Sequence, residues 1–304
     1  MVTLAATRAG FTTSDEARVA RHFNHLERSW RRSLPGIPLV HVPSPETDMP
    51  ARLPRVSHKN RASVRYAVVS RLKDWVLPEG TVPESAGHDA AAHHLRLLLE
   101  AWVATRQERE PEALPVQIAR NLAVRWLEAA PAVGIDPDVC VLCPPPPEGS
   151  EVDSLRLWAR GHFPPLISFE IVSKNHPHKN YSAVHERYAA MGTVELVVFD
   201  PLLAGPRSLG GPVALQLWRR DEADTLERIH FGPGPAYSEV LGAWLHRRGN
   251  LLAITHDEEG KVLWLTPEEH ERAQKERERA QKERERVARL DAERRLAELG
   301  KRLG

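Results

Sequence analysis

The chain has 304 residues, with 42 Lys and Arg against 41 Asp and Glu, and 41% of its residues are hydrophobic. This composition is typical of a folded protein and excludes a largely disordered chain. Two cysteines cannot form a disulfide framework, no apolar run is long enough to span a membrane, and no secretory signal pattern opens the sequence. We therefore expect a cytoplasmic protein with no membrane contact. A net charge of +1 also argues against a protein that coats nucleic acid through bulk charge.

The charge is divided unevenly along the chain. Residues 1–80 carry 13 basic and 7 acidic side chains, residues 81–266 carry 17 and 24, and residues 267–304 carry 12 and 10. Prolines interrupt every periodic pattern near the start of the sequence. We therefore predict an irregular basic arm over 1–60, a folded domain over 61–266 and a charged helical tail over 267–304.

The middle region alternates between helical and extended patterns. We expect helices over 61–77, 87–107 and 182–191, the last ending at Gly192. Short runs rich in Val, Ile and Leu, bounded by Pro and Gly, predict strands at 116–126, 139–143, 166–173, 196–200, 213–218, 227–231 and 251–255. This order predicts a mixed α/β (α+β) domain built around a central sheet.

The tail repeats the heptapeptide ERAQKER at 271–277 and 278–284. Glu271 precedes Lys275 by four residues, which is the favourable orientation for an ion pair on a helix. Ala273, Ala280 and Val287 recur every seven residues, as in a coiled coil with a narrow apolar seam. The tail is therefore either a dimerising coiled coil or a single solvated helix held by ion pairs.

Two carboxylates lie within the predicted strands. Asp138 opens the apolar run at 139–143, and Glu170 lies inside the run at 166–173. A carboxylate is costly to bury without a cation or a strong donor. Asp138, Glu170 and the Ile171 carbonyl would supply the oxygen ligands that Mg²⁺ prefers. The alternative is that Asp138 caps a turn and Glu170 pairs with an arginine.

An ordered set of phrases between residues 68 and 265 resembles a known family. It comprises DWVLP at 74–78, PESAGHD at 83–89, ARNLAVRW at 119–126, PDV at 137–139, FEIVS at 169–173, HPHKNY at 176–181, YAAMG at 188–192, ELVVFDP at 195–201 and GAWL at 242–245. The set is similar to the Uma two family of restriction endonucleases, within the PD-(D/E)XK nuclease superfamily. Residues 1–60 have no counterpart in that resemblance.

The resemblance implies a restriction-endonuclease-like fold, in which helices flank a central mixed sheet, and an endodeoxyribonuclease that depends on Mg²⁺ or Mn²⁺. By analogy, Asp138 and Glu170 would bind the metal, and Glu84 would match an additional acidic residue. The superfamily places a lysine two residues after the acid, but this chain has Val172 there. Relatives that carry the lysine in the following helix have it where this chain has Val184. We therefore expect Lys179 to position the water or the phosphate.

Two further expectations follow. Cys140 and Cys143 have the spacing of a zinc motif, but residues three apart on a strand face opposite ways, so we expect buried structural thiols. The valines at 172 and 184 support an alternative function: a catalytically silent domain of the same fold that binds DNA or acts as a scaffold. In both cases we expect DNA as the partner, and a homodimer formed through the C-terminal helix.

Overall fold

The computed structural model describes residues 63–65, 75–77 and 85–303, apart from positions 176 and 183. The predicted basic arm and Glu84 lie outside these residues. The chain divides into two compact units, Met1–Trp264 and Leu265–Gly304. No helix in the described ranges is both long and apolar enough to cross a membrane.

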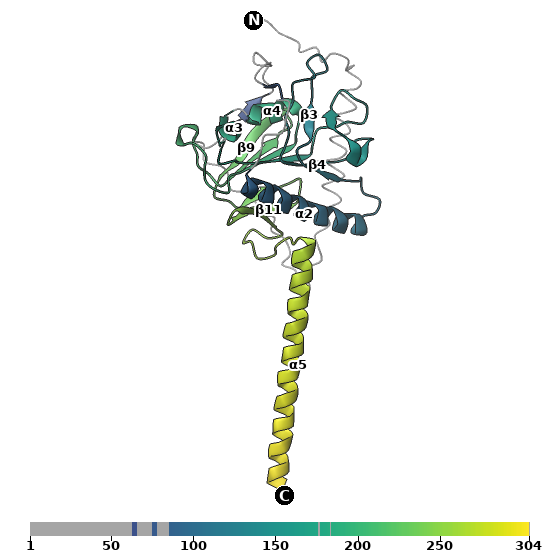
Figure 1. The fold of residues 1–304 in the computed structure, drawn as a ribbon, viewed down its shortest axis with the longest axis vertical. Coiled ribbons are helices and arrows are strands. Elements are labelled where there is room, and N and C mark those ends of the chain that lie inside the picture. Colours follow the sequence, from purple (N-terminus) through teal and green to yellow (C-terminus); the bar gives the residue numbers. More distant parts are fainter. Residues whose placement is uncertain (1–62, 66–74, 78–84, 176, 183, 304) are drawn as a thin grey trace. The chain divides into compact units, whose positions relative to one another are not determined.

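A seven-stranded mixed sheet forms the centre of the first unit (Figure 1). Its order is β1 (Ser63–Arg65), β9 (Thr225–Gly232), β8 (Leu215–Arg220), β7 (Glu195–Phe199), β6 (Ile167–Ile171), β4 (Val139–Leu142) and β2 (Gln117–Ala119). Neighbouring strands are antiparallel except β6 and β7, which are parallel. Parallel neighbours need a crossover connection, and helices α3 (Pro177–Ser182) and α4 (Val184–Met191) provide it. The predicted mixed α/β class is confirmed.

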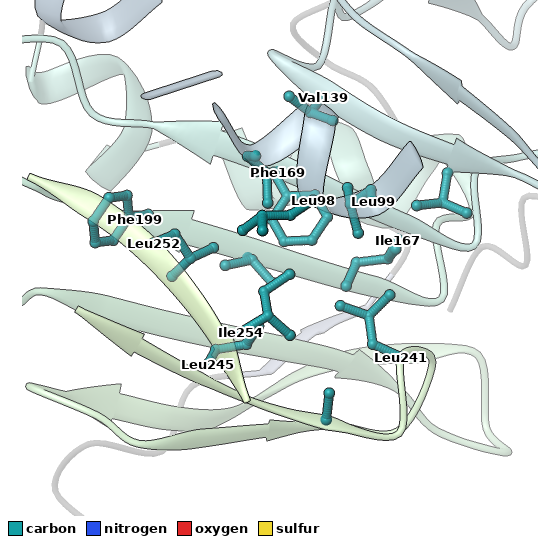
Figure 2. Close-up of a cluster of buried hydrophobic side chains, with 14 of the residues drawn as sticks. Leu98, Leu99, Val139, Ile167, Phe169, Phe199, Leu241, Leu245, Leu252 and Ile254 are labelled. Carbon is teal, nitrogen blue, oxygen red and sulfur yellow. The ribbon is translucent and has the colours of Figure 1, made fainter. Parts of the chain in front are cut away.

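Apolar side chains cover both faces of this sheet, as the unbroken buried runs of β4, β6 and β7 require. Helix α2 (Ala86–Arg109) packs on one face with a second sheet of β10 (Ala236–Ser238), β11 (Ala243–Arg248) and β12 (Leu251–Thr255). Figure 2 shows Leu98 and Leu99 of α2 close to Phe169 and Val139 of the central sheet. The opposite face packs against α3, α4 and the short parallel pair β3 (Ala123–Arg125) and β5 (Ser154–Arg156).

The element boundaries differ from the sequence prediction in several places. The strand expected at 116–126 is divided into β2 and β3, because Asn121 between them adopts a left-handed conformation with φ of 49°. The helix expected at 182–191 corresponds to α4, which ends at Met191 as predicted, and α3 is an additional helix just before it. Strand β1 lies inside the helix expected over 61–77, so that prediction is wrong at 63–65. Strands β5, β10 and β11 were not predicted, and the short 3₁₀ turns η3 (Gly149–Glu151) and η4 (Arg207–Leu209) complete the elements.

The second unit is one long helix, α5 (Pro267–Leu303). Its start is a capping box: Thr266 N donates to Glu269 Oε2 at 2.9 Å, and Glu269 N donates to Thr266 Oγ1 at 3.3 Å. Pro267 occupies the first helical position, where no backbone donor is needed. Exposed ion pairs four residues apart follow, such as that between Lys275 and Glu271.

Candidate functional site

Asp138 directly precedes β4 and completes the edge of β6 there. Successive backbone N–H groups of a strand point to opposite sides, and Val172 N donates to Phe199 O of β7. The N–H and the carbonyl of Ile171 therefore point towards β4, which begins only at Val139, opposite Phe169. Asp138 Oδ2 accepts the Ile171 N–H at 2.5 Å. This carboxylate replaces the backbone acceptor that β4 lacks at this position.

His88 joins the same point from α2. Its Nε2 lies 3.2 Å from Asp138 Oδ2 and 3.0 Å from the Ile171 carbonyl oxygen. Both neighbours are acceptors, so this arrangement requires a hydrogen on Nε2. His88 is held at the helix start because Ser85, the N-cap, accepts its backbone N–H. The imidazole is buried and ties the first turn of α2 to the central sheet.

Glu170 is enclosed from the other face of the sheet. Continuing the β4–β6 register by one step places it opposite Asp138, and only 1% of it is exposed. Asn180 Nδ2 of α3 donates to its Oε2 at 2.7 Å, and the Tyr188 hydroxyl of α4 donates to its Oε1 at 2.6 Å. Both carboxylate oxygens thus have protein donors. We call Asp138, Glu170, His88, Asn180 and Tyr188 the acidic centre.

The electrostatics of the acidic centre keep Tyr188 protonated. Burial raises the pKa of its phenol well above the usual value, and the negative charge of Glu170 and the hydrogen bond to it raise it further. Because the phenol keeps its hydrogen, Tyr188 acts as the donor in its hydrogen bond to the Glu170 carboxylate.

The remaining predicted site residues are not part of the acidic centre as described. Lys179 lies in α3, but its side chain is outside the described part of the structure, as is all of Glu84. Val172 and Val184, at the positions where the resemblance leads us to expect lysine, are 2% and 3% exposed and belong to the same apolar cluster as Tyr188. Apolar packing therefore fills both positions.

The sequence prediction did not include the three donors of the acidic centre. His88 is 50 residues from Asp138 in the sequence, and only its place near the start of a strong helix pointed to it. Asn180 and Tyr188 lie ten and eighteen residues after Glu170. The described partners of Glu170 are Asn180 and Tyr188, whereas Asp138 accepts from the neighbouring strand β6.

The predicted metal ligands can be compared with the needs of Mg²⁺, a cation that takes six oxygen ligands, including water. Asp138 Oδ2 and the Ile171 oxygen converge, but His88 Nε2 occupies the point between them. Each Glu170 oxygen accepts one hydrogen bond from a protein donor. Among the described residues, no group of three His, Cys, Asp or Glu side chains is placed to hold a metal ion. In the described residues, the predicted ligands are held by protein hydrogen bonds, and the magnesium site stays a prediction.

Two further buried carboxylates show how this domain treats such groups. Glu195 accepts hydrogen bonds from Arg219 at 2.8 Å and from Ser238 at 2.5 Å. Asp200 accepts from the backbone of Ala204 and Gly205, at 2.9 Å and 2.8 Å, in the loop that follows β7. Both are fully buried. A buried carboxylate in this sheet therefore does not by itself indicate a metal site.

The two cysteines are free and buried. Cys140 packs in the cluster beneath α4, whereas Cys143 packs in the cluster beneath α2. They therefore face opposite sides of the sheet, as the strand alternation predicted. Burial raises the pKa of Cys140 to about 12, which keeps it a thiol rather than a metal-binding thiolate.

Comparison with known proteins adds a distant likeness among solved structures. No family model matches the chain, and no curated protein matches it. Among solved structures, it is similar to a "putative nuclease belonging to DUF820" from Anabaena variabilis, with 13% identity and a TM-score of 0.34. The likeness covers 52% of this chain and 74% of that one.

Proposed function

We propose that the domain is a catalytically silent nuclease-like module that binds DNA and does not cut it. The observation that carries this proposal is that each carboxylate oxygen of Glu170 accepts a hydrogen bond, one from Asn180 and one from Tyr188. A buried carboxylate that accepts two short hydrogen bonds is stabilised by the protein itself. The costly burial of Glu170 then serves to fasten α3 and α4 to the sheet.

Asp138 has a similar structural purpose. It satisfies the Ile171 N–H and anchors His88, so removing it would leave a buried donor without an acceptor. The valines at 172 and 184 supply no charge for a phosphate and no proton for a leaving group. Each of these features is expected of a fold that has kept its architecture after losing hydrolysis.

A second candidate is the Mg²⁺- or Mn²⁺-dependent endonuclease that the resemblance implies. One observation favours it: Asp138 and Glu170 take facing positions on adjacent strands, and the Ile171 carbonyl lies beside Asp138. When bound, a divalent ion would polarise a phosphate and lower the pKa of a water molecule. His88, Asn180 and Tyr188 would first have to release the oxygens.

Incubation of supercoiled plasmid with the full chain and Mg²⁺ or Mn²⁺ separates the two candidates. The silent module leaves the plasmid supercoiled and retards it on a gel in proportion to protein concentration. Nicking or linearisation by the wild-type protein that disappears in both Asp138→Ala and Glu170→Ala would establish the endonuclease instead. Circular dichroism of the two variants shows whether each is folded.

The same proposal includes self-association through α5. Val287 and Leu290 lie three residues apart on one face of the helix and are 50% and 51% exposed. Pairing two copies would remove this apolar surface from water. Sedimentation of the full chain should show a dimer that the double variant Val287→Glu, Leu290→Glu converts to a monomer. A wild-type monomer at high micromolar concentration would contradict this part.

A further inference from the structure

Two arginines lie side by side on the face of the β3–β5 pair that is turned away from the central sheet. The parallel register pairs Arg125 with Arg156, and the preceding pair is Val124 with Leu155. Val124 and Leu155 are buried beneath the strands, at 0% and 1% exposure. Side chains alternate along a strand, so both arginines project on the outer side. Like charges at paired positions destabilise a sheet unless something offsets them.

The two guanidinium groups have few protein acceptors. Arg125 Nη1 donates to the Pro131 carbonyl at 2.5 Å, and its Nε donates to Ser154 Oγ at 3.2 Å. Arg156 is exposed, and within the described ranges its guanidinium forms no hydrogen bond or salt bridge. Glu148 is the carboxylate on which Arg156 acts. The pKa of Glu148 is lowered mainly by a backbone hydrogen bond, next by His162, and least by the charge of Arg156.

A cleft of about 770 Å³ opens between these arginines and an apolar wall. We call it the arginine cleft; it is lined by Val76, Leu77, Arg125, Pro131, Ala132, Arg156 and Trp158. Trp158 is half-buried, so part of its indole remains accessible from the cleft. The cleft thus combines two cations, an aromatic ring and aliphatic surface in one place.

The apolar wall is held in position by the backbone. Leu77 N donates to Ala132 O, and Gly134 N donates to Trp75 O, both at 3.0 Å. At Gly134, an added Cβ would come within 2.8 Å of both the Leu77 side chain and the Val124 carbonyl oxygen. Only glycine permits this close approach, which fixes the wall against β3. A fixed cleft lowers the cost of ordering on binding.

We propose that the arginine cleft binds a nucleotide unit, with the phosphate on Arg125 and Arg156 and the base against Trp158. Planar guanidinium groups match the geometry of phosphate oxygens, and an indole stacks on any base. A phosphate would also offset the repulsion between the paired arginines. This inference deepens the proposed DNA binding and uses no residue of the acidic centre. The nucleotide unit can belong to a strand or be free in solution.

Fluorescence anisotropy of a labelled oligothymidylate of about 12 nucleotides tests the proposal with the full chain in EDTA and low salt. Arg156→Ala and Trp158→Ala should each weaken binding by about tenfold, and Arg156→Lys should recover part of the loss. Arg248→Ala, which removes an exposed arginine from β11, is the matched control and should bind as the wild type does. Unfolding curves establish that all variants are folded.

Three results would overturn the proposal: unchanged affinity in Arg156→Ala or Trp158→Ala, an equal loss in Arg248→Ala, or displacement of the oligonucleotide by polyglutamate as readily as by unlabelled oligothymidylate. The last would assign the cleft to acidic peptides. Efficient displacement by thymidine monophosphate would support the cleft and identify free nucleotides as the ligand. EDTA removes divalent ions, so this experiment measures binding alone. Cleavage, which would overturn the silent module, is tested separately with plasmid and Mg²⁺ or Mn²⁺.

Discussion

The acidic centre and the arginine cleft treat their charges in opposite ways. In the acidic centre, Asp138 and Glu170 are buried and receive hydrogen bonds from His88, Asn180, Tyr188 and a backbone amide. In the arginine cleft, two like charges are paired beside an open volume of about 770 Å³. Charges satisfied inside the protein stabilise a fold, whereas like charges held close together with few protein acceptors are available for a ligand. The contrast separates a structural role from a binding role.

The largest effect should come from removing Glu170. Glu170→Ala leaves the Tyr188 hydroxyl and the Asn180 amide buried without an acceptor, so we expect the free energy of unfolding to fall by about 2–4 kcal/mol. Urea denaturation measures this change. Glu108→Ala, at an exposed position on α2, is the control and should stay within about 0.5 kcal/mol of the wild type. An equally small decrease in the free energy of unfolding of both variants would show that Glu170 has no structural role.

Cysteine reactivity provides a second measure of how closed the acidic centre is. Cys140 lies on β4 two residues after Asp138, and burial raises its pKa to about 12. Alkylation requires an accessible thiolate, so labelling of Cys140 in the native protein should be at least about 100-fold slower than in urea. Mass spectrometry identifies the labelled site. Rapid native labelling would show that this part of the sheet opens easily.

His185 should make stability depend on pH. Its ring stacks on Trp218 with centroids 4.7 Å apart, and burial, with the charge of Arg228, lowers its pKa from 6.5 to about 4. The folded state therefore binds fewer protons than the unfolded state between these values, and stability falls as the pH drops from 6.5 towards 4. In His185→Phe, the free energy of unfolding should fall by about 1–2 kcal/mol less than in the wild type over this pH range. The value is an upper limit, because the ring is partly exposed and solvent screens its charge. His93→Phe, at an exposed site, should not change this pH dependence.

The smallest effect is expected in the arginine cleft. Arg156 is exposed and its guanidinium forms no hydrogen bond or salt bridge within the described residues, so Arg156→Ala should change the free energy of unfolding by less than about 0.5 kcal/mol. The same urea denaturation as for Glu170→Ala gives the value. A slight gain is consistent with relief of repulsion from Arg125. A decrease of several kcal/mol in the free energy of unfolding would show that Arg156 stabilises the fold, as the residues of the acidic centre are expected to do.

The sequence predicted the elements that have strong periodic patterns. Apolar runs around Cys140 and Phe169 located β4 and β6, and therefore placed Asp138 and Glu170 near one another. β5 and β10 were missed because three residues carry no reliable period, and the six-residue β11 was missed as well. The pairing of Arg125 with Arg156 depends on two such strands, so no local pattern could reveal the arginine cleft.

The hydrogen-bond partners of Asp138 and Glu170 could not be predicted from the sequence either. Burial of Glu170 predicts that it needs donors or a cation, but the choice depends on how α3 and α4 dock on the sheet. His88 reaches Asp138 only because α2 packs on the opposite face of the sheet from α3 and α4, with its first turn near the start of β4. Tertiary packing therefore determines which donors reach the two carboxylates, and the residue types alone left this open.

The most direct test of the account follows one labelled oligonucleotide through two steps. Its anisotropy is first raised by the full-length protein in EDTA and then recorded over time after excess Mn²⁺ is added. We predict a rise that depends on Arg156 and a constant signal afterwards, because the strand is bound and remains intact. A progressive fall after Mn²⁺ in the wild type but not in Asp138→Ala would show cleavage at the acidic centre and contradict the account.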